Sequence, residues 1–278
     1  MRALRHLAAV GVLLGALQVA HAQTIDPGKH FRSGVWDQWI FWTVPGPSAF
    51  AAVQRVVERA NAARGTAGLP LLNADPGYPL IFAVYEENDA RGPDGKSLAD
   101  ATPNRESFLA TFVDLDDGSS VVFFLTDQIR SNAELTAKGV PGVPGTFTAS
   151  TERNLQGDGT TRTELKWNIA TASGDAISFK AEYGDDAVAF RGRTPGAAAY
   201  LANGVGLTLA LVYSALPTQL FLFYERNQSA WYDLPTRKVE VKLAGHSHDA
   251  DVDAMYNDAH NTPIELIELK RVVRIQRQ

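Results

Sequence analysis

The feature that most constrains this fold is a long succession of short segments rich in β-branched and aromatic residues, each followed by turn-forming residues. Such segments are typical of β-strands, and the Gly, Asp, Asn and Pro residues between them favour tight turns. Many strands joined by short turns predict an antiparallel sheet that is closed or folded on itself. Strands are predicted at residues 36–42, 80–85, 108–115, 121–125, 146–151, 162–169, 176–183, 188–191, 207–213, 220–224, 238–243 and 264–275.

Helical periodicity is confined to a few stretches. Residues 48–60 carry apolar side chains three and four positions apart, with Ser48 as the expected N-cap and Gly65 as the expected stop. Residues 127–138 fit either a helix or a loop, and residues 197–201 predict the start of a second short helix. The chain is therefore predicted to be α+β and mainly β, with few short helices.

The first residues have the pattern of an export signal. A basic start precedes an apolar run over residues 7–19, and Ala20 and Ala22 give the spacing of small residues at a cleavage site. The run is shorter than the ~20 residues of a membrane-spanning helix. We therefore expect a cleaved signal peptide at residues 1–22, a single β-rich domain at residues 23–278, no membrane span after cleavage, and a periplasmic or secreted location.

Charge and cysteine content exclude several classes of function. The chain has 26 basic and 31 acidic side chains and no basic run, whereas nucleic-acid binding relies on clustered Lys and Arg, so no nucleic-acid partner is expected. It has no cysteine, which excludes disulfides, thiolate metal sites and a cysteine nucleophile. Stability must therefore come from the core, which the 45% of hydrophobic residues can supply.

The densest group of potential metal ligands is the pair His246 and His248 with the aspartates that follow. Alternate side chains of a strand share a face, so both imidazoles could bind one zinc-sized ion. The segment begins at Gly245 and is also typical of a solvated loop, which is the favoured interpretation. We therefore expect no metal and no other cofactor, and His246 and His248 stay as a less favoured alternative.

Nucleophilic chemistry is better supported at a lysine than at a serine. The chain has no Gly-x-Ser-x-Gly motif, and the prolines in the glycine-rich residues 139–145 remove amide donors that a phosphate-binding loop uses. Most lysines fit solvated positions. Lys138 differs because it directly precedes this rigid turn, where a fixed backbone can hold its amine in a pocket.

Taken together, these landmarks resemble the acetoacetate decarboxylase-like family. The resemblance covers most of the chain after the signal, through short motifs. They are the helix at residues 48–60 and the segment 69–72, the paired strands at residues 108–125, the frame of residues 134–137 and 142–144 around the expected lysine, and the closing residues 223–225, 234–235 and 247–248.

The resemblance implies an antiparallel, cone-shaped β-barrel and a lyase that acts on a small keto acid through a Schiff base on Lys138. It also implies an acid that moves protons, for which Glu86 and Glu87, just after the strand at residues 80–85, are the candidates. Arg32 is the candidate for binding the substrate carboxylate. Members of the family often assemble into rings, so the resemblance is also compatible with a homo-oligomer.

One departure from the family leaves the activity open. Its decarboxylases carry two adjacent lysines, and the neighbouring cation lowers the pKa of the nucleophilic amine. Here Lys138 is followed by Gly139. Burial alone can still favour a neutral amine. The sequence therefore supports two functions, a Schiff-base lyase or a non-catalytic periplasmic protein of the same fold that binds a keto acid or an apolar ligand.

Overall fold

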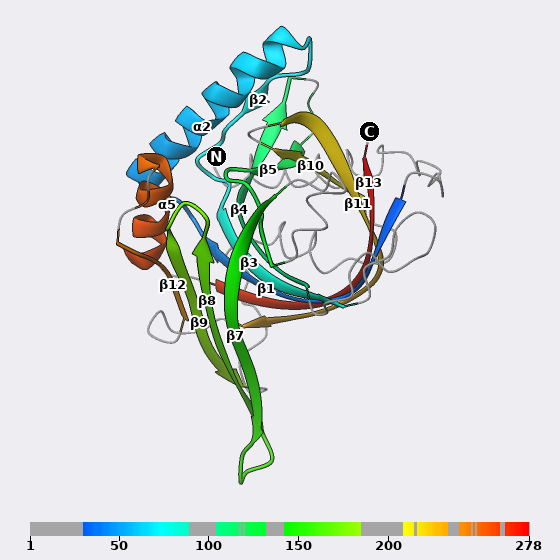
Figure 1. The fold of residues 1–278 in the computed structure, drawn as a ribbon, viewed down its shortest axis with the longest axis vertical. Coiled ribbons are helices and arrows are strands. Elements are labelled where there is room, and N and C mark those ends of the chain that lie inside the picture. Colours follow the sequence, from blue (N-terminus) through cyan, green and yellow to red (C-terminus); the bar gives the residue numbers. More distant parts are fainter. Residues whose placement is uncertain are drawn as a thin grey trace, which may run out of the picture.

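The structure is a computed structural model that describes residues 30–88, 104–116, 118, 120–131, 142–184, 208–213, 216–232, 239–245, 247, 249–261 and 265–277. Within these ranges the chain folds into one large sheet and two helices (Figure 1). The helices are α2 (Pro47–Thr66) and α5 (Ala250–Asn261). The strands are β1 (His30–Thr43), β2 (Leu72–Asn73), β3 (Leu80–Asn88), β4 (Asn104–Leu115), β5 (Ser120–Phe124), β6 (Ile129–Arg130), β7 (Val143–Leu155), β8 (Thr161–Thr171), β9 (Ala176–Gly184), β10 (Thr208–Tyr213), β11 (Leu216–Tyr232), β12 (Val239–Ala244) and β13 (Glu265–Arg277).

Part of the sheet closes into a barrel. Pairing runs from β4 through β3, β1, β13, β11 and β10 to β5, and β5 pairs back with β4. The predicted mainly β barrel with few helices is confirmed. The sheet is mixed rather than antiparallel throughout, because β10 pairs with β5 and β6 pairs with β7 in parallel.

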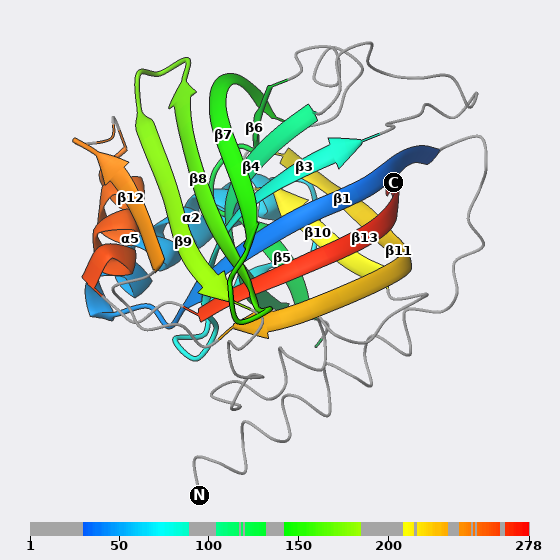
Figure 2. The ribbon, with the colours of Figure 1, turned by 90° about the horizontal axis from the view of Figure 1, so that it is seen from below.

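Strand β4 belongs to both the barrel and an outer layer. Its second half, from Ala110 to Asp114, pairs with β5, whereas Glu106 and Ser107 pair with β6. From β6 the sheet continues through β7, β8 and β9 to β12, and these strands lie beside the barrel (Figure 2). The β7–β8 hairpin projects from the body of the molecule (Figure 1).

The helices begin and end for local reasons. α2 begins at Pro47 rather than at the predicted Ser48, because proline is preorganised for the first helical position and Gly46 takes the N-cap. It runs one residue past Gly65, and its buried apolar side chains are those of Ala49, Ala52, Val53, Val56, Val57 and Ala60. α5 was not predicted, and it packs against α2 and β12 (Figure 1).

The main hydrophobic core lies between the barrel wall and the outer layer. Trp39 of β1 packs on Trp167 of β8 with ring centroids 5.9 Å apart, and Phe41 packs on Phe179 of β9 at 5.2 Å. Phe82 of β3 meets Tyr256 of α5 at 4.9 Å. This face of β1 and β3 therefore points out of the ring, and the alternate residues of both strands lie on the face that points into it.

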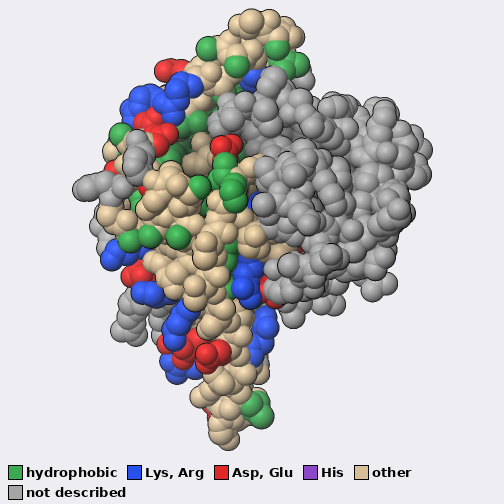
Figure 3. All heavy atoms as spheres, in the orientation of Figure 1, with side chains coloured by type: hydrophobic (Ala, Val, Ile, Leu, Met, Phe, Trp, Pro, Cys, Tyr) green, Lys and Arg blue, Asp and Glu red, His purple; other side chains and the backbone are tan. Residues whose placement is uncertain are grey.

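The surface of the described residues carries both signs of charge. In Figure 3 basic and acidic side chains lie interspersed over helix α2 and over the projecting part of the sheet. Some form pairs at the surface, such as Lys166 with Glu164 within β8 and Lys180 of β9 with Glu240 of β12. Neither helix in these ranges has the combined length and hydropathy that crossing a membrane requires.

Candidate functional site

A row of polar residues crosses the inner face of the barrel wall. Gln38 of β1 is paired with Tyr85 of β3, Tyr85 with Glu106 of β4, and Glu106 with Arg130 of β6. Residues directly opposite each other in a sheet share a face, so all four side chains lie on one side of the wall. Since Trp39 and Val84 lie on the outer face with the main core, this row lies on the inner face.

Glu106 is the centre of a hydrogen-bonded cluster. Asn104 Nδ2 donates to Glu106 Oε1 at 2.7 Å and to Glu87 Oε2 at 2.9 Å. Arg130 donates to the same Glu106 oxygen and, from its other terminal nitrogen, to Gln128 Oε1. These five residues are 0% to 5% exposed, so the cluster joins three strands through contacts that exclude water.

The electrostatics of Glu106 set it apart from an ordinary ion-pair partner. Burial raises the pKa of its carboxyl from 4.5 to about 7, although the charge and hydrogen bond of Arg130 act in the opposite direction. Its second oxygen, Oε2, is buried and has no hydrogen-bond partner in the described part of the chain. Glu106 can therefore change its protonation state near neutral pH.

Glycine at position 142 lets the backbone pack directly on this cluster. Gly142 has φ +152°, and a Cβ there would lie 2.7 Å from Arg130 Nε and 2.8 Å from the Gln128 carbonyl oxygen. The next residue, Val143, donates its amide to that carbonyl at 2.7 Å. The start of β7 is thus fixed against the side chain that holds Glu106.

Replacing this glycine is expected to destabilise the protein. Gly142→Ala should lower the free energy of unfolding by about 2 kcal/mol, because alanine disfavours this φ and its methyl group displaces Arg130. The measurement is urea unfolding. Gly157→Ala is the matched control, since a Cβ at that turn meets nothing within 4 Å and should change stability little. Equal stability of the two variants would show that β7 tolerates a side chain here.

The structure places the predicted acids on opposite faces of β3. Glu87 belongs to the inner cluster through Asn104. Glu86 lies on the other face, where its Oε2 accepts from Arg105 Nε at 3.1 Å. Glu86 and Glu87 are thus not brought together.

The other predicted residues have no described side-chain positions. Arg32 is in β1, where its backbone is paired with Arg274 of β13, and nothing is described of its side chain. Lys138, His246 and His248 lie outside the described residues. Within those residues there is no group of three or more His, Cys, Asp or Glu side chains placed to hold a metal ion.

Sequence reasoning missed Asn104, Glu106 and Arg130. Asn104 and Glu106 lie between the strands predicted at residues 80–85 and 108–115, in a polar stretch where no strand was predicted. One available signal was the period of two that joins Asn104 and Glu106 to Phe108 and Ala110. No comparable signal marks Arg130, because β6 is only two residues long.

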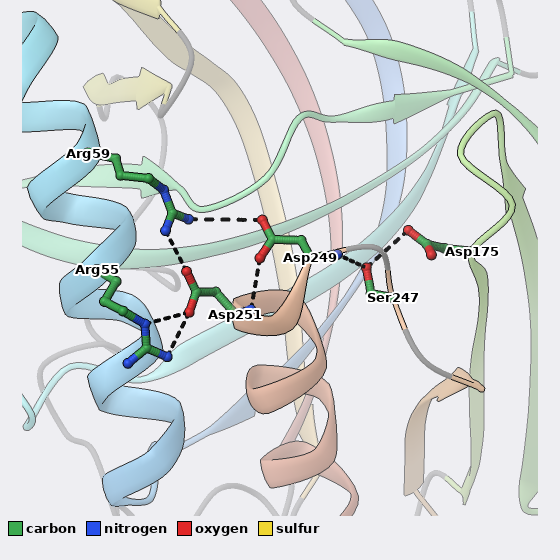
Figure 4. Close-up of polar contacts among 6 residues, drawn as sticks. All are labelled: Arg55, Arg59, Asp175, Ser247, Asp249 and Asp251. Atoms are coloured by element: carbon green, nitrogen blue, oxygen red, sulfur yellow. Dashed lines mark hydrogen bonds and ion pairs between the residues drawn. The ribbon is translucent and has the colours of Figure 1, made fainter.

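A second polar network, at the α2–α5 contact, contains aspartates from the predicted metal segment (Figure 4). Asp251 Oδ1 accepts from Arg55 Nε at 2.7 Å, and Oδ2 accepts from Arg59 Nη1 at 2.6 Å. Asp249 Oδ1 accepts the amide of Asp251 at 2.8 Å and so caps the start of α5. The polar segment that was predicted to be a loop is therefore in part the ordered start of a helix.

Asp251 is expected to stabilise the contact between the two helices. Burial acts to raise the pKa of its carboxyl, but hydrogen bonds from Arg59 and Arg55 and their charges outweigh burial and lower it. Asp251→Asn should therefore cost about 1–2 kcal/mol in urea unfolding at pH 7, because both arginines are half-exposed and can be solvated. Glu164→Gln, which breaks an exposed pair, is the control and should cost less than about 0.5 kcal/mol. A smaller loss for Asp251→Asn than for this control would contradict a stabilising role.

Comparison with models of known protein families and with curated proteins finds no match to this chain. The assignment of function consequently depends on the geometry of the Glu106 cluster and on the motifs in the sequence.

Proposed function

We propose that this protein is an exported lyase that acts on a keto acid through a Schiff base on Lys138, with Glu106 as the group that transfers the proton. The observation that carries the proposal is a fully buried carboxyl on the inner face of the barrel, with a pKa of about 7 and one unengaged oxygen. A group with this pKa is suited to donate and accept a proton at neutral pH. The expected acid thus moves from Glu86 and Glu87 to Glu106, with Glu87 as its neighbour through Asn104.

The connectivity of the chain supports a lysine near this carboxyl. The segment that carries Lys138 follows Ser131, whose Oγ lies 3.4 Å from Asn104 Oδ1, and it precedes Gly142, which packs on Arg130. Four residues span at most about 14 Å, so Lys138 is within that reach of Gly142. Arg130 would supply the buried cation that a second lysine supplies in the resembled family.

The chemistry uses each group once. The neutral amine of Lys138 adds to the ketone, and loss of water gives an iminium ion. In a 3-keto acid such as acetoacetate, the bond to the carboxylate then breaks, its electron pair forms the enamine, and carbon dioxide leaves. Glu106 then gives its proton to the enamine carbon, and water hydrolyses the resulting iminium to release the ketone and the amine. Arg32 is proposed to orient the substrate carboxylate before that step.

Trapping of the iminium tests the proposal. The mature protein is incubated with acetoacetate or pyruvate and borohydride, and its peptides are analysed by mass. The expected result is a reduced adduct on Lys138 that disappears in Lys138→Ala and persists in Lys166→Ala, which removes an exposed lysine. Glu106→Gln should keep the adduct with pyruvate but slow the release of carbon dioxide from acetoacetate. Absence of an adduct with every keto acid removes the catalytic proposal.

The second candidate is a non-catalytic protein that binds a keto acid or an apolar ligand in the same barrel. The missing second lysine favours it, because Gly139 gives no cation beside Lys138. A ligand that co-purifies in native mass spectrometry, together with no borohydride adduct and no turnover, would support this candidate over the lyase.

A further inference from the structure

Strand β7 has one long edge that no other strand of the described chain pairs with. On one side its residues 145–155 are all paired with β8. On the other side only Val143 and Pro144 are paired, with β6. The β7–β8 hairpin projects from the body of the molecule, so most of this free edge lies away from the barrel (Figure 1).

Side-chain burial indicates that the free edge is open to solvent. Phe147 and Ala149 of β7 are directly opposite Ile169 and Trp167 of β8, so the four side chains share one face of the sheet. Ile169 and Trp167 are 2% and 1% exposed, whereas Phe147 and Ala149 are only partly buried. The difference is expected when a strand has a neighbour on one side and water on the other.

Two backbone hydrogen bonds show which residues of β7 turn their N–H and C=O groups to the free edge. Gln156 N donates to Thr160 O at 2.8 Å on the β8 side, and Val143 N donates to Gln128 O at 2.7 Å on the opposite side. These groups alternate between the two edges along a strand, so the odd-numbered residues of β7 point away from β8. The free edge therefore presents the backbone groups of Phe147, Ala149, Thr151 and Leu155.

The free edge lacks the devices that commonly prevent strand pairing. Exposed edges are usually shielded by prolines, bulges or charged side chains. The pairing of β7 with β8 has no bulge, no proline follows Pro144 in the strand, and the first charged residue is Glu152. The strand also ends in Leu155, an apolar side chain that is 77% exposed. Such an edge is suited to pair with a further strand.

We propose that β7 pairs with β7 of a second copy of this chain, antiparallel across a two-fold axis at Thr151. In this dimer Thr151 faces Thr151 of the second copy, and Phe147 faces Leu155 of the second copy. The exposed leucine thus gains an apolar neighbour on the same face of the sheet. The pairs formed by these three residues exchange about six backbone hydrogen bonds and join the two outer layers into one continuous sheet.

Contacts at the base of β7 exclude a two-fold axis nearer to the body of the molecule. An axis at Ser150 would bring Leu155 of the second copy opposite Gly145. A Cβ at Gly145 would already collide with the side chain of Ile129 from β6, so that part of the edge is occupied. The axis therefore lies beyond Ser150.

Charge excludes a two-fold axis nearer to the tip of the hairpin. An axis at Glu152 would place the two Glu152 carboxylates directly opposite each other, and an axis at Arg153 would do the same with two guanidinium groups. Like charges in directly opposite positions destabilise strand pairing. With the axis at Thr151, Glu152 faces Ser150 of the second copy and no like charges are directly opposed.

Sedimentation equilibrium over a range of concentrations tests for the dimer. We expect the mass to rise from one chain to two with a dissociation constant in roughly the micromolar range, because the contact is small, so chains in dilute solution unfold as monomers. Thr151→Lys should raise that constant about fivefold, because two lysines then face each other across the axis. An equal mixture of Thr151→Lys and Thr151→Glu should dimerise at least as tightly as the wild type.

Asn168→Lys is the matched control. Asn168 is exposed on β8, so this variant adds the same charge to the same layer away from the free edge, and it should leave the dissociation constant unchanged. Circular dichroism checks that each variant is folded.

A cysteine at the axis tests the register directly. The chain has no cysteine, so Thr151→Cys introduces a single thiol. Residues of a hydrogen-bonded antiparallel pair have Cα atoms about 5.5 Å apart, within the range that a disulfide spans. With copper–phenanthroline as the oxidant, the two thiols should form a disulfide that gives a covalent dimer on a non-reducing gel. Asn168→Cys, treated in the same way, should stay a single chain on the gel.

Two results would overturn the proposal, and neither bears on the chemistry proposed for Lys138. If the chain stays monomeric at every concentration, there is no second copy at β7, and the edge is open to an extended segment of another protein. If a dimer forms but Thr151→Lys does not weaken it and Thr151→Cys does not cross-link it, the two copies meet through another surface.

Discussion

Arg130→Met is expected to destabilise the protein by about 3 kcal/mol at pH 8 and by no more than about 1 kcal/mol at pH 5. At pH 8 the variant leaves Glu106 buried without its cation, a mechanism that produces large losses. At pH 5 Glu106 is protonated in the folded state, so there is little negative charge for Arg130 to balance. Urea unfolding at both pH values measures the difference.

The pKa of Glu106 determines whether stability rises or falls with pH. Its folded pKa of about 7 lies above the ordinary 4.5, so between these values the folded state holds a proton that the unfolded state has released. The wild-type free energy of unfolding should therefore fall as pH rises from 4.5 to 7. Glu106 contributes up to about 3 kcal/mol to this fall, and its contribution no longer changes above pH 7. In Arg130→Met the fall continues above pH 7, because the charge that lowers the pKa of Glu106 is gone.

Two controls isolate this effect. Glu106→Gln should remove the fall in the free energy of unfolding between pH 4.5 and 7, whatever the overall stability of the variant. Arg105→Met removes a partly exposed arginine that pairs with Glu86 on the other face, and it should cost at most about 1 kcal/mol at either pH. An equal loss for Arg130→Met at pH 5 and pH 8 would mean that Glu106 does not change charge in this range.

Trp167→Ala is expected to have the other large effect, a loss of about 3–5 kcal/mol without the pH dependence of Arg130→Met. Trp167 is 1% exposed and lies between Trp39 of the barrel wall and Phe147 of β7, with ring centroids 5.9 and 6.2 Å away. Its removal leaves a space that the two layers cannot close, because each is held by its own sheet hydrogen bonds.

Urea unfolding at pH 5 and pH 8 tests this expectation. Leu155→Ala is the control, since that side chain is 77% exposed in the β7–β8 hairpin and should contribute less than about 0.5 kcal/mol. A loss of less than 1 kcal/mol for Trp167→Ala would show that the outer layer does not depend on this contact.

The strands that sequence reasoning predicted well are those that bury one face. In β8, Leu165, Trp167 and Ile169 are buried and alternate with exposed residues, so the period of two is visible in the sequence. Strand β9 was predicted at residues 176–183 and spans Ala176–Gly184 for the same reason. Where the environment of each strand face repeats along the chain, local patterns are sufficient.

The Glu106 cluster could not be predicted in this way. Asn104 and Glu106 are polar and suggest a solvated segment, and their burial depends on Arg130 and Glu87, which come from other strands. Only the paired register brings these residues together. The start of α5 was not predicted for a different reason, because its acidic residues were attributed to a loop. The missed signals were Asp249, which is a favoured N-cap, and the apolar residues Met255, Tyr256 and Ala259, which recur at helical spacing.

The pairing of β1 with β13 has a consequence for how this protein is made. These strands, which stand at opposite ends of the described chain, face each other from His30–Gln276 to Trp42–Glu265. The ring of strands that forms the barrel cannot close while residues 265–277 are still inside the ribosome. Contacts so distant in sequence slow folding, so the barrel can close only after residues 265–277 have left the ribosome.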